Sequence, residues 1–183
     1  MSNKKELLSQ KDISITIERL SQQLIENHSD FHDTIFIGIQ PRGTFLNRRI
    51  LDNLLIKNTG TSIQSGNIDI SFYRDDLRRR DQPIVPAIMD IDFSVEGKNV
   101  VLIDDVLYTG RSVRSAIDAL MTFGRPKSVE LLTLINRRFS RHLPIQPNYV
   151  GKTIDVLDSE KVIVEWQEAV GRDRVLIVNK ENG

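Results

Sequence analysis

The sequence predicts an α/β fold in which helices flank a central, mostly parallel and twisted sheet. Two segments carry this prediction, one from Thr34 to about Lys57 and one from Val100 to about Phe123. In each, a short apolar run is followed by a small polar loop and then by an amphipathic stretch. Such units build parallel sheets, in which ligands bind at the carboxyl ends of the strands. We therefore expect two ligand-facing loops at one edge of the sheet.

The composition fits one domain over residues 1–183, since 39% of the residues are apolar and 27% are charged. Cysteine is absent, which excludes disulfides and thiolate chemistry, and the three histidines lack the spacing of zinc ligands. No apolar run is as long as a membrane span, and the first residues lack the apolar core of a signal peptide. We expect a cytoplasmic protein. The net charge of zero argues against bulk nucleic-acid binding but permits a local basic patch.

Residues 11–27 are predicted to form the first helix, with Asp12 as its N-cap. Apolar side chains recur on one face of this helix, as expected for the core or for a subunit interface. They are Ile13, Ile17, Leu20 and Leu24.

The first strand–loop–helix unit begins with a buried strand over Thr34–Ile39 and continues into a helix from about Thr44 to Lys57. In the loop between them, Arg42 offers positive charge to an anion, and Gly43 lets the backbone approach a ligand closely. Pro41 makes a cis or kinked peptide bond easier at this point.

A long irregular region follows the second predicted helix. Residues 58–67 are polar and turn-rich, and Ile68–Tyr73 alternates as a half-exposed strand does. The charged run Arg74–Asp81 then begins a segment without regular periodicity that extends to about Lys98. A long charged loop after a strand is often a lid over a functional site.

The second unit carries the strongest functional signal. A buried strand, Val100–Ile103, is followed by the acid pair Asp104 and Asp105, a small loop Thr109–Ser112 and an amphipathic helix to about Phe123. The first N–H groups of a helix bind phosphate, whereas paired carboxylates bind sugar hydroxyls or a shared Mg²⁺. Side by side, these groups suit a phosphorylated sugar.

The last third of the chain contains further strands. Val129–Ile135 is a buried strand, and the chain is irregular from Asn136 onward. Two later runs, Val162–Trp166 and Arg174–Val178, have the composition of strands.

The string Asp-Asp-Val-Leu-Tyr-Thr-Gly-Arg-Ser at 104–112 resembles the 5-phosphoribosyl-1-diphosphate (PRPP) signature of type I phosphoribosyltransferases. The residues of this string are similar to those of the PyrR family of pyrimidine operon regulators and uracil phosphoribosyltransferases. The resemblance implies the type I phosphoribosyltransferase fold with a small hood region, mainly from about 136–165. A Walker B strand is the competing interpretation, but the Gly151-Lys152-Thr153 sequence lacks the first glycine of a phosphate-binding loop.

The resemblance also implies which residues bind the substrate. The phosphate and ribose of PRPP or UMP would contact Asp104, Asp105, Val106, Leu107, Tyr108, Thr109, Gly110, Arg111 and Ser112. A pyrophosphate loop would consist of Pro41, Arg42 and Gly43, and a lid would begin with Arg74, Asp75 and Asp76. Mg²⁺ would arrive with PRPP and lie near the acid pair, without dedicated protein ligands.

The implied reaction converts uracil and PRPP into UMP and diphosphate, with Asp104, Asp105 and Arg42 as the catalytic residues. Purine enzymes of the hypoxanthine and guanine type carry a carboxylate where this chain has Tyr108, so a pyrimidine base is favoured. Two alternatives stay open. One is a regulator that binds nucleotides with little turnover, and the other is a phosphoribosyltransferase for a purine base.

The family's second role is UMP-responsive regulation of pyrimidine-biosynthesis genes, by binding leader mRNA and promoting transcription termination. RNA binding needs a local basic surface. The candidates are Arg19, Arg137, Arg138, Arg141 and Lys152. The run 136–142 departs from the family pattern and is one residue longer. The family also forms dimers and higher assemblies, so we expect a homo-oligomer and no membrane partner.

Overall fold

The computed structural model describes residues 4–57, 60, 62–71, 73 and 90–180. Its centre is a five-stranded sheet with strand order β3-β2-β4-β5-β6, in which all neighbouring strands are parallel. The strands are β2 (Thr34–Ile39), β3 (Gln64–Ile68), β4 (Asn99–Leu107), β5 (Ser128–Arg137) and β6 (Tyr149–Ile154). The predicted central parallel sheet is therefore confirmed.

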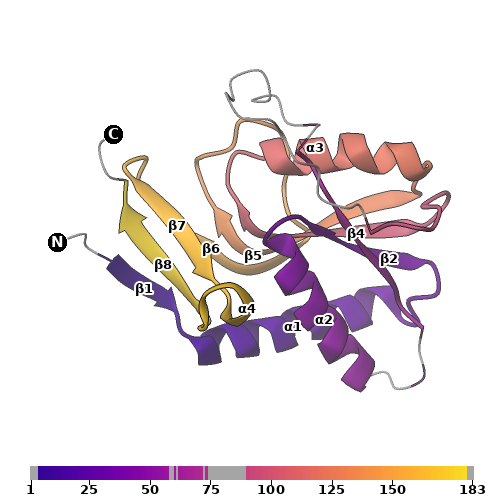
Figure 1. Cartoon of the computed structure of the whole chain (residues 1–183), viewed down its shortest axis with the longest axis horizontal. Helices are drawn as coiled ribbons and strands as arrows, with labels where there is room; N and C mark the ends of the chain where they lie inside the picture. The colour runs from indigo at the N-terminus through magenta and orange to yellow at the C-terminus, as the bar shows by residue number, and fades with distance from the viewer. Residues whose placement is uncertain (1–3, 58–59, 61, 72, 74–89, 181–183) are drawn as a thin grey trace.

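Helices cover both faces of this sheet (Figure 1). On one face lie α1 (Gln10–His28) and α2 (Gly43–Lys57), and on the other lies α3 (Arg111–Leu120), which continues into the short 3-10 helix Met121–Phe123. The buried residues form two apolar clusters, one on each face of the sheet. β2 and β4 supply side chains to both clusters, because alternate residues of a strand point to opposite faces.

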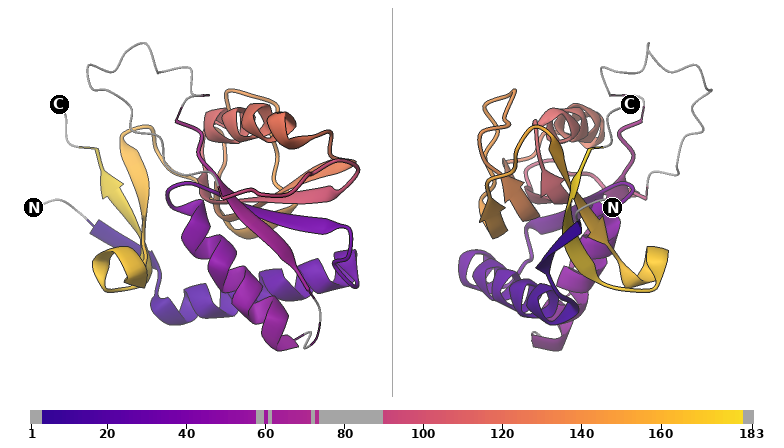
Figure 2. Two further views of the ribbon diagram at one scale, coloured as in Figure 1. Left: turned by 45° about the vertical axis from the view of Figure 1, so that its right-hand side comes forward. Right: turned by 90° about the vertical axis from the view of Figure 1, so that its left-hand side faces the viewer.

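A second, three-stranded antiparallel sheet stands beside the main one, with order β1-β8-β7 (Figure 2). Its strands are β1 (Lys4–Leu8), β7 (Glu160–Glu165) and β8 (Arg174–Asn179), and the short helix α4 (Gln167–Val170) joins the last two. Because β1 pairs with β8, the first and last described parts of the chain lie side by side. Residues 136–165, predicted to form most of the hood, contain the end of β5, all of β6 and all of β7.

The first helix begins earlier than predicted, and Asp12 is not its N-cap. Ser9 is the N-cap: its hydroxyl accepts from the Asp12 N–H at 3.3 Å, while the Asp12 carboxylate accepts from the Ser9 N–H at 2.9 Å. This reciprocal pair is a capping box, which the sequence analysis missed because the cap lies three residues before the carboxylate. The apolar stripe of α1 packs into the chain's own core, with Leu20 and Leu24 fully buried.

The predicted strand Ile68–Tyr73 is wrong, because β3 lies at Gln64–Ile68 instead. After Ile68 the carboxylate of Asp69 accepts hydrogen bonds from the N–H and the hydroxyl of Ser71, at 2.8 and 2.6 Å. An Asp that binds the backbone two residues later makes a turn rather than a strand. The alternating pattern was therefore misleading, since turn chemistry outweighed it.

Candidate functional site

The carboxyl ends of β2 and β4 place the two predicted ligand loops next to each other. β4 is longer than predicted and includes both acids before it ends at Leu107. The loop after β2 packs on β4, because a Cβ at Gly43 would collide with the carbonyl oxygen of Ile103. Only glycine permits this approach, which brings the loop at 40–43 to the backbone next to the acid pair.

The peptide bond between Gln40 and Pro41 is cis, as the sequence suggested. Arg42, which follows it, is exposed. Burial raises the pKa values of both Asp104 and Asp105, and the positive charge of Arg42 opposes that rise, so the guanidinium acts on the two acids through space. The structure thus brings the three predicted catalytic residues into one electrostatic unit.

The environment of the acid pair disfavours its ionised form, with Asp105 buried and Asp104 half-buried beside the cavity. Asp105 is only 7% exposed, and its Oδ2 atom is buried without a hydrogen-bond partner. Burial raises the pKa of Asp105 to about 6. Burial, together with the neighbouring Asp105 charge, raises the pKa of Asp104 well above its usual value. Two acids held in this way are suited to receive positive charge from a ligand.

A cavity of about 280 Å³ lies at the end of β4. Its lining includes every predicted phosphate- and ribose-binding residue except Asp105, and the cavity also extends to Val113. Gly110 is the N-cap of α3 and has a φ of 90°, in the left-handed region that favours glycine. The cavity therefore opens onto the positive end of a helix, where an anion is stabilised.

The segment after β5 covers this loop. The guanidinium of Arg137 lies 4.1 Å from the centre of the Tyr108 ring. Arg141 Nη1 donates a hydrogen bond to the Tyr108 carbonyl oxygen. The His142 N–H donates one to the Thr109 carbonyl oxygen at 3.0 Å. Arg137 is only 3% exposed, and its Nε and Nη2 atoms have no hydrogen-bond partner. It therefore belongs to the interior of the site, although the sequence analysis grouped it with surface bases.

The other proposed RNA-contacting residues lie at the surface or are bonded within the protein. Arg19 donates to the carbonyl oxygens of Val150 and Gly151 at 3.2 and 2.6 Å. Arg138 forms a two-pronged ion pair with Asp155 at 2.7 and 2.6 Å. Lys152 is exposed on β6.

The predicted lid residues Arg74, Asp75 and Asp76 lie outside the described residues. The last described residue before them, Tyr73, accepts a hydrogen bond through its carbonyl oxygen from Ser115 of α3 at 3.0 Å. Tyr73, the residue before the predicted lid, therefore lies beside α3.

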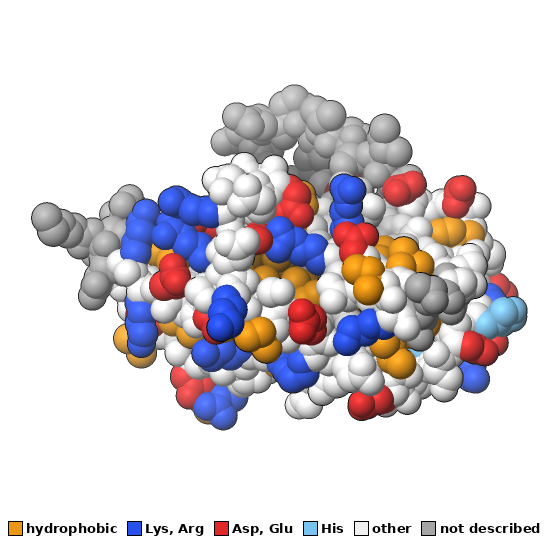
Figure 3. All heavy atoms as spheres, turned by 90° about the horizontal axis from the view of Figure 1, so that it is seen from below, with side chains coloured by type: hydrophobic (Ala, Val, Ile, Leu, Met, Phe, Trp, Pro, Cys, Tyr) orange, Lys and Arg blue, Asp and Glu red, His pale blue; other side chains and the backbone are white. Residues whose placement is uncertain are grey.

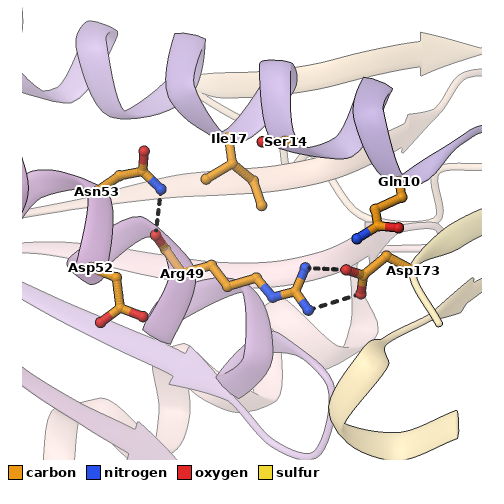
Figure 4. A pocket seen from close by; sticks show the side chains of 7 residues that line it. All are labelled: Gln10, Ser14, Ile17, Arg49, Asp52, Asn53 and Asp173. Atoms are coloured by element: carbon orange, nitrogen blue, oxygen red, sulfur yellow. Dashed lines mark hydrogen bonds and ion pairs between the residues drawn. The ribbon is translucent and has the colours of Figure 1, made fainter. Parts of the chain in front are cut away.

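A second hollow of about 220 Å³ lies between α1, α2 and the start of β8 (Figure 4). Its central feature is Arg49, whose Nη1 and Nη2 donate to the carboxylate of Asp173 at 2.9 and 2.8 Å. Arg49 also donates to both carboxylate oxygens of Glu168, at 3.1 and 2.8 Å. These bonds tie α2 to the small sheet, so we assign the cluster a structural role.

Among the described residues, no group of three or more His, Cys, Asp or Glu side chains is arranged to hold a metal ion. Within the same ranges, no helix has both the length and the apolar character needed to cross a membrane.

Comparison with known proteins places these features in a family. The phosphoribosyl transferase domain family matches residues 3–169. The bifunctional protein PyrR of Clostridioides difficile is 40% identical over 178 residues, covering 97% of this chain and 99% of that protein. The bifunctional protein PyrR of Bacillus subtilis is 38% identical over 184 residues, covering 99% and 100%.

Solved structures share the fold at low identity. The hypoxanthine phosphoribosyltransferase of Trypanosoma cruzi matches with a TM-score of 0.72 at 16% identity, covering 97% of both chains. That of Staphylococcus aureus matches with a TM-score of 0.70 at 22% identity, covering 96% of this chain and 91% of the other. These likenesses confirm the type I phosphoribosyltransferase fold. The domain match over residues 3–169 and the near full-length PyrR matches show that this chain belongs to the phosphoribosyltransferase family and, within it, to the bifunctional PyrR proteins.

Proposed function

We propose that this protein transfers the 5-phosphoribosyl group of PRPP to uracil, which yields UMP and diphosphate. The bond from ribose C1 to uracil N1 forms, the bond from C1 to the diphosphate oxygen breaks, and the N1 proton leaves to solvent. The observation that carries the proposal is the acid pair, half-buried Asp104 and buried Asp105, beside the 108–112 loop and the 40–43 loop in a chain of the PyrR family.

Asp104 and Asp105 would bind the ribose hydroxyls and stabilise positive charge that develops on the ribose as diphosphate leaves. The unpartnered Oδ2 of Asp105 supplies an acceptor that the protein itself does not use. The loop from Tyr108 to Ser112 would hold the 5′-phosphate at the N-terminus of α3. No side-chain nucleophile is required, because positioning and electrostatics account for the catalysis.

The pyrophosphate loop, Pro41, Arg42 and Gly43, would bind the departing diphosphate, with Arg42 balancing its charge. Mg²⁺ fits here as an ion shared with the substrate, since two carboxylates are too few for a site made by protein alone. When bound, it would neutralise charge on the diphosphate, held by substrate oxygens and Asp104 or Asp105. The lid residues Arg74, Asp75 and Asp76 would exclude water that otherwise hydrolyses PRPP.

Arg137 adds a residue that the sequence analysis did not place in the active site. A guanidinium that is almost fully buried with two unpartnered nitrogens is costly unless a ligand accepts from it. Because the same group stacks on Tyr108, a base near that ring would present its carbonyl oxygens to Arg137. Uracil has two such carbonyls, which agrees with the pyrimidine preference inferred from Tyr108.

A steady-state assay tests the proposal and its two alternatives together. Uracil, hypoxanthine and guanine are offered with Mg²⁺ and PRPP, and the nucleotide product is measured for each. We expect UMP to form with a kcat/KM at least tenfold above that of either purine. Preference for a purine would overturn the choice of base, and no nucleotide from any base would favour the regulator with little turnover.

We further propose that the protein binds pyrimidine leader mRNA in a UMP-dependent manner. Lys and Arg side chains on the face of α1 and α2 are more numerous toward the small sheet, with acidic side chains between them (Figure 3). The exposed Lys152 and the nearby Arg19, which bonds to the same strand, are the preferred contacts. Arg138 is neutralised by Asp155 and Arg137 is buried, so these two contribute less positive potential at the surface, and Arg141 is only partly exposed in the hood.

An RNA titration with and without UMP checks this role. The wild type is expected to bind leader RNA more tightly with UMP present, and Lys152→Ala is expected to weaken binding and reduce its salt dependence by about one ion. Equal affinity for an unrelated RNA hairpin, with no effect of UMP, would refute it.

We also propose that the chain forms a homo-oligomer. The apolar stripe of α1 is used inside the subunit, so a different surface must supply the contact. On α1 and α2, three apolar side chains are exposed and could form the contact between subunits. They are Ile15, Leu55 and Ile56. Sedimentation analysis of the wild type and of Ile56→Lys measures this, and a monomeric wild type would refute it.

A further inference from the structure

Two successive peptide groups of the phosphate loop are held from the hood side. The carbonyl oxygen of Tyr108 accepts a hydrogen bond from Arg141 Nη1, and the carbonyl oxygen of Thr109 accepts one from the His142 N–H at 3.0 Å. Arg141 is itself anchored, because its Nη2 donates to Asn136 Oδ1 at 2.7 Å. The segment at 141–142 therefore fixes the direction in which both carbonyls point.

The direction of a carbonyl determines that of the next N–H, since the two point in opposite directions across a trans peptide bond. The bond before Pro41 is the one cis bond among the described residues, so the peptide groups after Tyr108 and Thr109 are trans. The N–H groups of Thr109 and Gly110 must then point away from the hood segment. Within the described part of the chain, neither donates a hydrogen bond to another protein group.

The cavity at the end of β4 is formed by this same loop. Its lining consists of Asp104 and residues 106–113 and does not include Arg141 or Ile145. Both of these side chains lie against Gly110, because a Cβ built there would lie 3.3 Å from Ile145 and 3.6 Å from Arg141. Thr109 and Gly110 themselves line the cavity, so N–H groups that point away from the hood segment are available to an anion there.

We propose that Arg141 is a positioning residue for the 5′-phosphate. By holding the Tyr108 carbonyl outward, it turns the Thr109 N–H into the cavity, beside that of Gly110. Successive inward N–H groups form a concave site for an anion, and the 5′-phosphate is the anion that this cavity would receive. The inference rests on the proposed function, which places that phosphate in this loop. Arg141 touches no substrate in this arrangement and acts only through the peptide group.

The proposal separates ligands that carry a phosphate from ligands that do not. If Arg141 orients phosphate-binding N–H groups, its loss weakens the binding of UMP and PRPP but leaves the binding of uridine and uracil unchanged. If Arg141 only stabilises the hood, its loss weakens all four ligands to a similar degree. The comparison of UMP with uridine is therefore more informative than either measurement alone.

The test uses Arg141→Met, which keeps most of the aliphatic chain that packs on Gly110 and removes the donors. Calorimetric titration gives the Kd of UMP and of uridine for the variant and the wild type. We expect the Kd of UMP to rise about tenfold, as for loss of a charge-assisted hydrogen bond, with the Kd of uridine unchanged. In steady state, the KM for PRPP should rise while the KM for uracil stays the same.

Arg138→Met is the matched control, because Arg138 lies three residues earlier, and at the surface its side chain pairs with Asp155 at 2.6 Å and lies over the Phe139 ring, away from the Tyr108 carbonyl. It should change neither Kd. Arg141→Lys should restore part of the UMP affinity, since one ammonium reaches the Tyr108 carbonyl less well than a guanidinium anchored on Asn136. Asn136→Ala, which keeps Arg141 but removes its anchor, should show a smaller loss in the same direction.

An Arg141→Met variant that binds UMP as tightly as the wild type, or that loses UMP and uridine equally, would overturn the inference. If circular dichroism shows that Arg141→Met does not fold, Arg141→Lys and Asn136→Ala decide by the same ratio of UMP to uridine. Failure of the wild type to form UMP would instead defeat the proposed function. The two outcomes are distinct, because the binding ratio requires no turnover.

Discussion

The two ends of the five-stranded sheet contain similar polar residues but satisfy them differently. At the amino end, the His28 ring bonds to Glu130 at 3.0 Å, to the Tyr149 hydroxyl at 3.1 Å and to the Thr34 hydroxyl at 3.1 Å. Tyr149 also donates to Glu130 at 2.8 Å. This network is closed, since each member finds its partners within the protein.

At the carboxyl end, two charged groups are buried and incompletely paired, namely Asp105 at Oδ2 and Arg137 at Nε and Nη2. The other described side chains with buried unpaired atoms are neutral, and they belong to Gln23, Asn47 and Trp166. Leaving a charged group unpaired costs more than leaving an amide or indole unpaired. The comparison teaches that one end of the sheet stabilises the fold, while the other is kept for a ligand at the expense of stability.

The largest expected effect is that of Asp105→Asn, which keeps the shape of the side chain and removes its charge. Activity should fall about 10²- to 10³-fold, because the acid no longer stabilises charge on the ribose. The fold should become more stable at neutral pH, on the order of 2 kcal/mol, since burial holds the pKa of Asp105 at about 6. The assay above and urea denaturation at pH 7.5 measure the two effects.

The pH dependence supplies the control for this variant. A carboxyl whose pKa is raised by folding favours the folded state while it is protonated, so its contribution is fullest below about pH 4 and is lost as the pH rises through about 6. The wild type should therefore lose stability between pH 4 and 7, and Asp105→Asn should lose less. If the free energy of unfolding changes with pH in the same way for both proteins, burial does not raise the pKa of Asp105.

The next largest effect is expected for Gly43→Ala. The added Cβ meets the carbonyl oxygen of Ile103, so the 40–43 loop must move away from the acid pair. We expect activity to fall at least tenfold and the free energy of unfolding to fall by about 2 kcal/mol. Gly97→Ala is a control for backbone strain without a collision, because Gly97 has a φ of 70° but an added Cβ would meet nothing within 4 Å. Similar activity loss in both variants would argue against the close packing of the two loops.

A smaller effect is expected for Arg137→Met, which tests whether the unpaired guanidinium serves the base. The KM for uracil should rise about tenfold, while the Kd of PRPP stays near that of the wild type. Stability should change little or improve, because an incompletely paired buried charge is replaced by an apolar chain. An unchanged KM for uracil would show that the base does not contact Arg137. The unpaired guanidinium would then not serve the ligand, contrary to the comparison of the two ends.

The smallest effect is expected at the closed end. Tyr149→Phe removes the hydroxyl that joins Asn27, His28 and Glu130, and should cost about 1 kcal/mol of unfolding free energy. Activity should be unchanged, since the network lies at the opposite edge from the cavity. Thermal unfolding and the steady-state assay measure both. A loss of activity without a loss of stability would contradict the division of roles between the ends.

The sequence by itself determined the parallel sheet, the two strand–loop–helix units and the string from Asp104 to Ser112. These features are local, because buried strands, helix starts and a phosphate loop each depend on residues close together in the chain. Turn and cap chemistry was harder to see, as Ser9 and Asp69 show, since one side-chain hydrogen bond outweighed the periodic pattern around it.

Only the tertiary structure decided what the basic run after β5 does. From sequence, Arg137, Arg138 and Arg141 are alike, and all three were assigned to an RNA surface. In the fold, Arg137 is buried on Tyr108, Arg138 pairs with Asp155, and Arg141 holds the Tyr108 carbonyl. The side chain of an arginine is long, and its partner is chosen by strands and loops distant in sequence, so its role is settled by packing rather than by residue type.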